Sequence, residues 1–103
     1  MSFRSPKHRK WVASLPCAIC GAVKRSQAAH TYVLGRSIKA SDKNVIPLCA
    51  DSFKGQGCHS KYDQYKFSED LKTKAKELGR ELHKVTLNDI AAFRLLREFR
   101  DDI

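Results

Sequence analysis

The sequence predicts a small α+β domain in which a two-stranded hairpin and a short helix are held together by a metal ion. Three observations carry this prediction. Four cysteines form two separated sets, two apolar segments between them are typical of short strands, and the residues after the last cysteine have the periodicity of helices. A chain of 103 residues has room for one domain, 1–103, with a marginal core that a metal would help to stabilise.

The first elements expected are a short helix and a metal-binding turn. Residues 5–14 could form the helix, because Ser5 can cap it and Pro6 suits a first helical position. The pair Cys17-x-x-Cys20 would then bring two thiols together across a tight turn. Gly21 permits the backbone to fold back at this point.

A hairpin with a long loop between its strands is expected next. Residues 27–34 contain small, β-branched and aromatic side chains, and residues 44–49 form a second apolar segment. Pro47 favours a short or edge strand there. Residues 50–57 would form a loop that leads to a helix beginning at Cys58.

Two more helices are expected in the C-terminal extension, 67–103. Ser68 can cap the first, and Thr86 opens a sequence that resembles a capping box for the second. The apolar face predicted for the first helix consists of Leu71, Ala75, Leu78 and Leu82. The apolar stripe predicted for the second consists of Ile90, Phe93, Leu96 and Phe99.

The positive charge is concentrated in the N-terminal part of the chain. The net charge is +9, and residues 1–41 contain eight of the 20 Lys and Arg residues but no acidic residue. Such a surface attracts the phosphate backbone of nucleic acids without regard to sequence. The chain contains no run of about 18 apolar residues and no secretory signal. We therefore expect a cytoplasmic protein without a membrane span, whose cysteines are thiolate ligands and not disulfides.

The cysteines could together hold one structural zinc ion. The spacing within the second set is long, but it is tolerable if residues 50–57 loop out. The alternative is that some of the cysteines are free, buried thiols. A closed site of this kind would hold the fold and leave no position for a substrate. The expected ligands are Cys17, Cys20, Cys49 and Cys58.

Two histidines near the cysteines have the spacing of a hydrolytic site. A neutral imidazole such as His30 can take a proton from water, which phosphodiester hydrolysis requires. His59 and Asp63 are spaced i, i+4 on the expected helix and could hold a divalent ion. The alternatives are a hydrogen bond between these two, or His59 as a spare zinc ligand. His8 and His83 are expected to have no catalytic role.

These residues resemble the HNH endonuclease family, whose core is the ββα-metal or His-Me finger, and in particular its zinc-stapled branch of phage and prophage nucleases. The resemblance covers about residues 17–66. It implies that His30 activates water, that Asn44 steadies the loop and the base, and that His59 binds the catalytic Mg2+ or Mn2+. The matching elements are Cys17-x-x-Cys20, Ala29-His30, the segment 44–49 and the segment 58–63.

One difference from the family concerns the residue before His30. Many members carry Asp, Glu or His there as a metal ligand, whereas this chain has Ala29. We expect Asp63 or a water molecule to take the place of that ligand. Ala29 also favours the main alternative, a non-catalytic zinc-stabilised module that binds nucleic acid. A weaker alternative is a small adaptor whose C-terminal helices bind a partner protein.

The resemblance implies a metal-dependent endonuclease that cleaves DNA, with RNA as a second possible substrate, and that acts as a monomer or homodimer. Basic residues near the site are expected to grip phosphates without reading bases, so the sequence specificity should be low. These residues are Arg36, Lys39, Lys43, Lys54 and Lys61.

Overall fold

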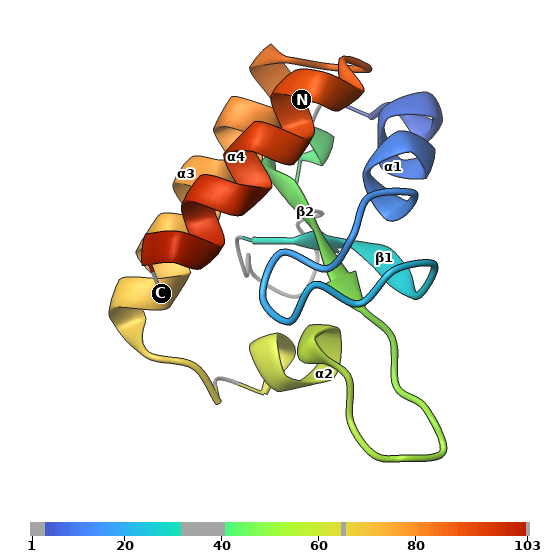
Figure 1. Cartoon of the computed structure of the whole chain (residues 1–103), viewed down its shortest axis with the longest axis vertical. Coiled ribbons are helices and arrows are strands. Elements are labelled where there is room, and N and C mark those ends of the chain that lie inside the picture. Colours follow the sequence, from blue (N-terminus) through green and yellow to red (C-terminus); the bar gives the residue numbers. More distant parts are fainter. Residues whose placement is uncertain (1–3, 32–40, 65, 103) are drawn as a thin grey trace.

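A computed structural model describes residues 4–31, 41–64 and 66–102, and within these ranges the chain has the predicted α+β architecture. The two strands form one antiparallel sheet, and the helices lie around it (Figure 1). In chain order they are α1 (Pro6–Ala13), β1 (Ser26–His30), the 3-10 turn η1 (Asp42–Asn44), β2 (Val45–Cys49), α2 (Cys58–Asp63), α3 (Glu69–Lys84) and α4 (Asp89–Asp102).

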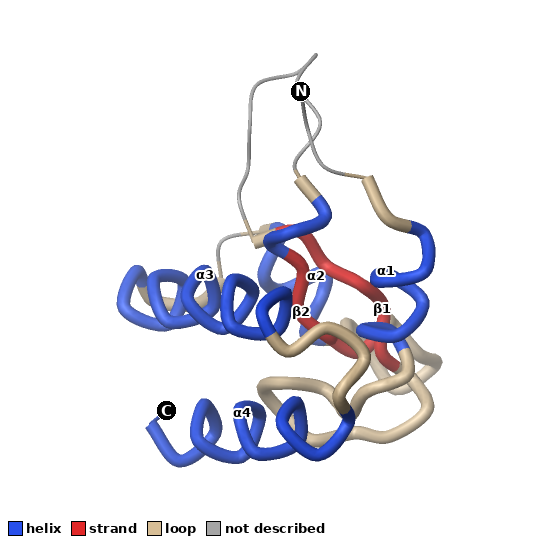
Figure 2. The backbone as a smooth tube through the Cα atoms, turned by 90° about the horizontal axis from the view of Figure 1, so that it is seen from above, coloured by secondary structure: helices blue, strands red, loops and turns tan. Residues whose placement is uncertain are grey.

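The hairpin formed by β1 and β2 is at the centre of the fold. Its register pairs Ser26 with Cys49 and His30 with Val45. All five residues of β2 are buried, because α1 and α3 pack against the hairpin from two sides (Figure 2). Pro47 has no amide to donate, but its carbonyl accepts a hydrogen bond from the Ala18 amide (2.8 Å). The predicted hairpin is confirmed; residues 32–34 of its expected first strand lie outside the described residues.

The N-terminal helix begins where the sequence predicts. The Ser5 hydroxyl accepts a hydrogen bond from the His8 amide (3.1 Å) and so caps α1. Val12 is fully buried on the face of α1 that covers the hairpin. The helix therefore fastens the basic N-terminal residues to the sheet.

The two C-terminal helices lie side by side, and α3 packs against β2 on the other side of the hairpin from α1 (Figures 1 and 2). The predicted apolar face of α3 is confirmed, with Ala75, Leu78 and Leu82 buried in the common core. This core is continuous from the cysteine-containing turn through the hairpin to α4. No helix among the described residues is long and apolar enough to cross a membrane.

The apolar stripe predicted for α4 is wrong in its first half. Leu96 and Phe99 are buried as expected, but Ile90 is 78% exposed and Phe93 is 48% exposed. The predicted residues are spaced by three, and each step of three falls about 60° short of a full turn, so that Ile90 and Phe99 lie on opposite sides of the helix. Ala92 completes the buried face instead, because residues spaced by four and three stay on one side.

The start of α4 also differs from the prediction. Its cap is Asn88, whose side-chain oxygen accepts a hydrogen bond from the Ala91 amide (3.1 Å). The Thr86 hydroxyl instead donates to the His83 carbonyl at the end of α3. The capping function predicted for Thr86 therefore belongs to the residue two positions later.

Candidate metal centre and histidine site

The sulfur atoms of the four cysteines converge on one point. Their ligand atoms all lie within 4.8 Å of one another, and the Cys20 and Cys49 sulfurs are 3.6 Å apart. Zinc–sulfur bonds of about 2.3 Å in a tetrahedral site place the sulfurs about 3.8 Å from each other. The cluster could therefore hold a metal ion such as zinc. Its members are the predicted Cys17, Cys20, Cys49 and Cys58.

Backbone amides point at two of the sulfur atoms in the cluster. The turn after Cys17 is closed by a hydrogen bond from the Gly21 amide to the Cys17 carbonyl (3.0 Å), and Gly21 has a positive φ of 79°. The Cys58 amide donates to the Cys49 sulfur (3.2 Å), and the Cys20 amide to the Cys17 sulfur (3.5 Å). A negatively charged sulfur accepts such bonds more strongly than a neutral one.

The long spacing between Cys49 and Cys58 is accommodated by a loop that closes at Gly57. A Cβ atom at this position would lie 2.3 Å from the Cys49 carbonyl oxygen and 2.4 Å from that of Ala50. Only glycine allows the backbone to approach so closely. The chain can therefore leave the cluster at Cys49 and return to it at Cys58, as the sequence analysis required.

Without a cation, ionisation of the clustered thiols is unfavourable. Burial raises the pKa of the Cys58 thiol far above its usual value, and the adjacent Cys17 sulfur raises it further. A bound divalent ion reverses this effect, because it stabilises the thiolates that it binds. From α4, the Arg100 guanidinium donates two hydrogen bonds to the Cys17 carbonyl, so the C-terminal helix is fastened to the same turn.

His30, at the end of β1, is held by a buried carboxylate. Its Nε2 lies 2.9 Å from Oδ1 of Asp42, which has no exposed surface. Burial opposes the ionisation of Asp42, but hydrogen bonds from the Ser5 amide and His30 and the charge of Arg9 outweigh it and hold its pKa below the usual value. An ionised carboxylate only accepts, so Nε2 carries the proton and Nδ1 is the ring nitrogen with a lone pair.

Sequence reasoning missed Asp42. Besides His30, it accepts a hydrogen bond from the Ser5 amide (2.8 Å) and lies 3.5 Å from the guanidinium groups of Arg4 and Arg9. It thus joins the start of α1 to the hairpin. One signal in the sequence could have identified it, since Asp42 is the first acidic residue of a strongly basic N-terminal part.

Asn44 restrains the end of β1 through its main chain. Its carbonyl oxygen accepts hydrogen bonds from the Thr31 amide (2.8 Å) and the Thr31 hydroxyl (3.1 Å). Helix α3 packs closely here, since a Cβ atom at Gly79 would lie 3.2 Å from the Asn44 Cα. Asn44, which holds the residue after His30, is therefore itself kept in place by α3.

His59 lies on α2 between a neutral and a charged partner. Its Nδ1 lies 2.8 Å from Oε1 of Gln27 on β1, and its Nε2 lies 3.5 Å from Oδ2 of Asp63. The amide oxygen of Gln27 accepts, so Nδ1 carries the proton and Nε2 has a lone pair that faces the carboxylate. The 3.5 Å separation fits a proton shared by the two groups as well as a cation held between them. Sequence reasoning missed Gln27, and a single glutamine before His30 gave no signal for it.

Helix α2 contacts β1 at Gln27 and the main chain just after β1 at Thr31. His59 reaches Gln27, and the Tyr62 hydroxyl donates to the Thr31 carbonyl (2.9 Å). Gln27 and His30 are three residues apart, about 10 Å along a strand, and side chains at this odd spacing point to opposite faces of the sheet. Ala29 lies between them and is fully buried in the core.

Three of the predicted phosphate-binding residues are described and exposed, namely Lys43, Lys54 and Lys61. Arg36 and Lys39 lie outside the described residues. Beside the sulfur cluster is a shallow pocket of about 220 Å3 whose basic lining residues are Arg25, Lys54 and Lys61, with no acidic residue among the lining. Arg25 was missed by the sequence analysis and suits the same role.

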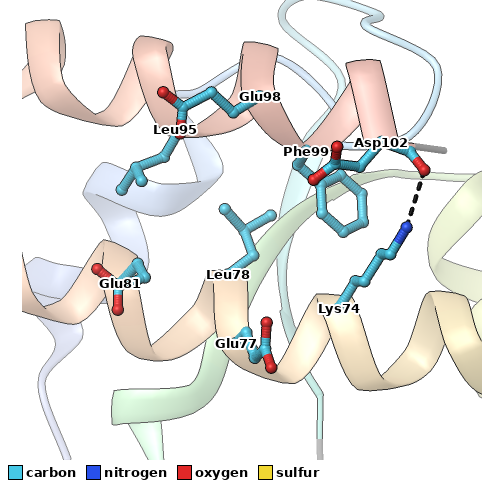
Figure 3. A pocket seen from close by; sticks show the side chains of 8 residues that line it. All are labelled: Lys74, Glu77, Leu78, Glu81, Leu95, Glu98, Phe99 and Asp102. Atoms are coloured by element: carbon cyan, nitrogen blue, oxygen red, sulfur yellow. Dashed lines mark hydrogen bonds between the residues drawn. The ribbon is translucent and has the colours of Figure 1, made fainter.

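The groove between α3 and α4 has the opposite character. Figure 3 shows that carboxylates line it from both helices. The Lys74 ammonium donates a hydrogen bond to the Asp102 carbonyl (2.8 Å). Such a groove repels phosphates. No described residue lines both this groove and the basic pocket beside the sulfur cluster. The acidic residues are Glu77, Glu81, Glu98 and Asp102.

The remaining two histidines lie together, away from the cysteine cluster. His8 of α1 is buried, and the ring of His83 of α3 meets it edge-on at 5.6 Å between centroids. Neither is among the contacts of His30 or His59 given above, and the absence of a catalytic role for them stays a prediction.

Comparisons with family models, with curated protein sequences and with solved structures give no match to this chain.

Proposed function

We propose that the chain is a metal-dependent endonuclease of the HNH type that hydrolyses phosphodiester bonds in DNA with low sequence specificity. The observation that carries this proposal is the His30–Asp42 pair, in which a buried carboxylate fixes the imidazole so that Nδ1 has a free lone pair. A positioned histidine with one lone-pair nitrogen is suited to general-base catalysis.

The surroundings of His30 support the same function. Helix α2, which carries His59 and Asp63, contacts the strand of His30 at Gln27, and the sulfur cluster joins the start of α2 to the end of β2. A metal at the four sulfurs would make this arrangement rigid. It would tie the turn of Cys17 and Cys20, the end of β2 and the start of α2 to one ion. The net charge of +9 supports a polyanionic substrate.

In the proposed reaction, His30 Nδ1 accepts a proton from a water molecule as the water oxygen forms a bond to phosphorus. The bond from phosphorus to the 3′ oxygen breaks, and that oxygen takes a proton from solvent. Asp42 stabilises the imidazolium that forms, because its charge lies 2.9 Å from Nε2. The backbone of Asn44 keeps the end of the strand in place.

The catalytic ion would be held by the lone pair of His59 Nε2 and the carboxylate of Asp63, with water and phosphate oxygens completing its coordination. When bound, Mg2+ or Mn2+ supplies positive charge that offsets the charge developing on the phosphate. Gln27 orients His59 for this role, because its amide oxygen accepts a hydrogen bond from Nδ1 of the ring. Lys54, Lys61 and Arg25 would contact flanking phosphates.

Nicking of supercoiled plasmid tests the proposal. Wild-type protein with Mg2+ or Mn2+ should convert plasmid to the open circle, and His30→Ala should lose at least about 100-fold in rate. His83→Ala is the control, because this ring lies with His8 between α1 and α3. Nicking by purified His30→Ala at the wild-type rate would exclude the proposed base.

The second candidate function is a zinc-stabilised module that binds nucleic acid without cleaving it. It is favoured by Ala29, which is buried and offers no metal ligand next to His30. This alternative predicts salt-dependent binding of DNA or RNA by the wild-type protein with no nicking in either metal. The plasmid experiment, run beside a binding titration, separates the two candidates.

A further inference from the structure

The loop between β2 and α2 is a small hairpin of its own. Ser52 and Gly55 pair in both directions, with two backbone hydrogen bonds of 3.0 Å, so that Phe53 and Lys54 form a two-residue turn at its tip. At its base, the Asp51 carboxylate accepts a hydrogen bond from the Gly57 amide (2.8 Å). In Figure 1 the loop extends beyond α2, away from the body of the fold.

Phe53 stands at this tip with its side chain in water. It is 97% exposed, more than any other large apolar side chain among the described residues. The Lys54 ammonium lies 5.9 Å from the centre of its ring, and the basic pocket with Arg25 and Lys61 begins at the base of the same loop. An isolated exposed apolar residue is ordinary, but an aromatic ring combined with cations on a preformed turn is not.

The combination fits a nucleic-acid strand better than a protein partner. Protein interfaces surround an aromatic anchor with further apolar side chains, whereas the neighbours of Phe53 in the turn are Ser52, Lys54 and Gly55. Surfaces that bind single strands combine basic grooves with aromatic rings on which bases stack. In a duplex the bases are already stacked on each other, so a ring of this kind selects an unpaired base.

We propose that Phe53 is a base-stacking residue and that the loop 51–57 directs the protein to DNA with unpaired bases, such as single-stranded or branched segments. Lys54, Arg25 and Lys61 would hold the phosphates on either side of the stacked base. This inference rests on the proposed nuclease function, to which it adds the structural class of the substrate.

Binding titrations of the full chain, with its zinc and without added Mg2+ or Mn2+, test this inference. The probes are a labelled single strand of about 20 nucleotides and the matched duplex. Phe53→Ala should weaken binding to the single strand on the order of tenfold and change duplex binding by less than about twofold. Phe53→Trp should retain binding, and its added fluorescence should be quenched by the single strand, with wild type as the blank for Trp11.

Ile90→Ala is the matched control, because Ile90 is a second exposed apolar side chain and lies on α4. Equal single-strand affinity for Phe53→Ala and Ile90→Ala would overturn the stacking proposal while leaving the nuclease proposal intact. Equal losses on single strand and duplex would overturn it as well, since they exclude a preference for unpaired bases. A wild-type chain that binds neither probe would overturn both proposals. Nicking that persists in Phe53→Ala shows that the nuclease proposal stands independently of the stacking proposal.

Discussion

His30 and Asp42 are separated by twelve positions in the chain, yet Nε2 of the histidine lies 2.9 Å from a carboxylate oxygen that has no contact with solvent. This pair determines which nitrogen of the neutral ring carries the proton and which keeps its lone pair. It also connects the histidine to α1, because Ser5, the N-cap residue of that helix, donates its backbone amide to the same carboxylate.

Replacement of Asp42 by asparagine should reduce plasmid nicking at neutral pH by about 100-fold, because the amide cannot stabilise the imidazolium and can itself donate to Nε2. Zinc content and duplex binding should stay within about twofold of wild type. Arg9→Gln is the control, since it removes another neighbour of Asp42 without touching His30. Equal rates for Asp42→Asn and wild type would show that the pair has no part in the reaction.

Gln27→Leu should weaken the binding of the divalent ion about tenfold, because loss of the amide oxygen frees the His59 ring to adopt the other tautomer. The measurement is the Mn2+ concentration at half-maximal nicking, together with direct Mn2+ binding by electron paramagnetic resonance. Gln56→Leu is the matched control, as its amide contacts Gln64 and Lys66. Identical Mn2+ curves for the two variants would contradict the role assigned to Gln27.

Removal of zinc should unfold the chain. Zinc binding in small Cys-rich sites contributes roughly 10–16 kcal/mol at neutral pH, which is as large as the whole stability of a domain of this size. We expect one zinc per chain by elemental analysis, loss of the circular dichroism signal with a strong chelator, and its return when zinc is added. Cys20→Ser should lower zinc affinity without opening the core, because Cys20 is the exposed ligand. A chelated chain that keeps its fold would contradict a structural zinc.

Stability should fall in mild acid because of His8. Its ring is 2% exposed, and neither ring nitrogen has a hydrogen-bond partner among the described residues. Burial lowers its pKa, and the adjacent His83 lowers it further. The stabilising contribution of neutral His8 is thus complete above the unfolded value of 6.5 and is lost as the pH falls toward the lower folded pKa.

The loss from this single group is at most about 1.4 kcal/mol per pH unit. Urea unfolding of wild type and His8→Leu between neutral and mildly acidic pH measures it, and the variant should show the shallower decrease below pH 6.5. Protonation of the cysteines affects both proteins alike, so the difference reports His8. Parallel curves would exclude this contribution.

The local signals of the sequence were sufficient for the framework of the fold. The Ser5-Pro6 cap, the Cys17-x-x-Cys20 turn and the start of α2 at Cys58 follow from short-range chemistry, and the structure confirms each of them. Where the local signal was ambiguous, the prediction failed: on α4, a spacing of three placed Ile90 in the core, whereas the helix buries Ala92.

The sequence by itself determined which atoms could be ligands of the metal, because the spacing of the four thiols lets them meet at one point. Only the tertiary structure decided how the thiols and the two imidazoles are held. Asp42 reaches His30, Gln27 reaches His59 across 32 positions, and Arg100 reaches Cys17 across 83. Such partners come from segments distant in the chain, and their pairing depends on how α1, α2 and α4 pack on the hairpin, which no local periodicity encodes.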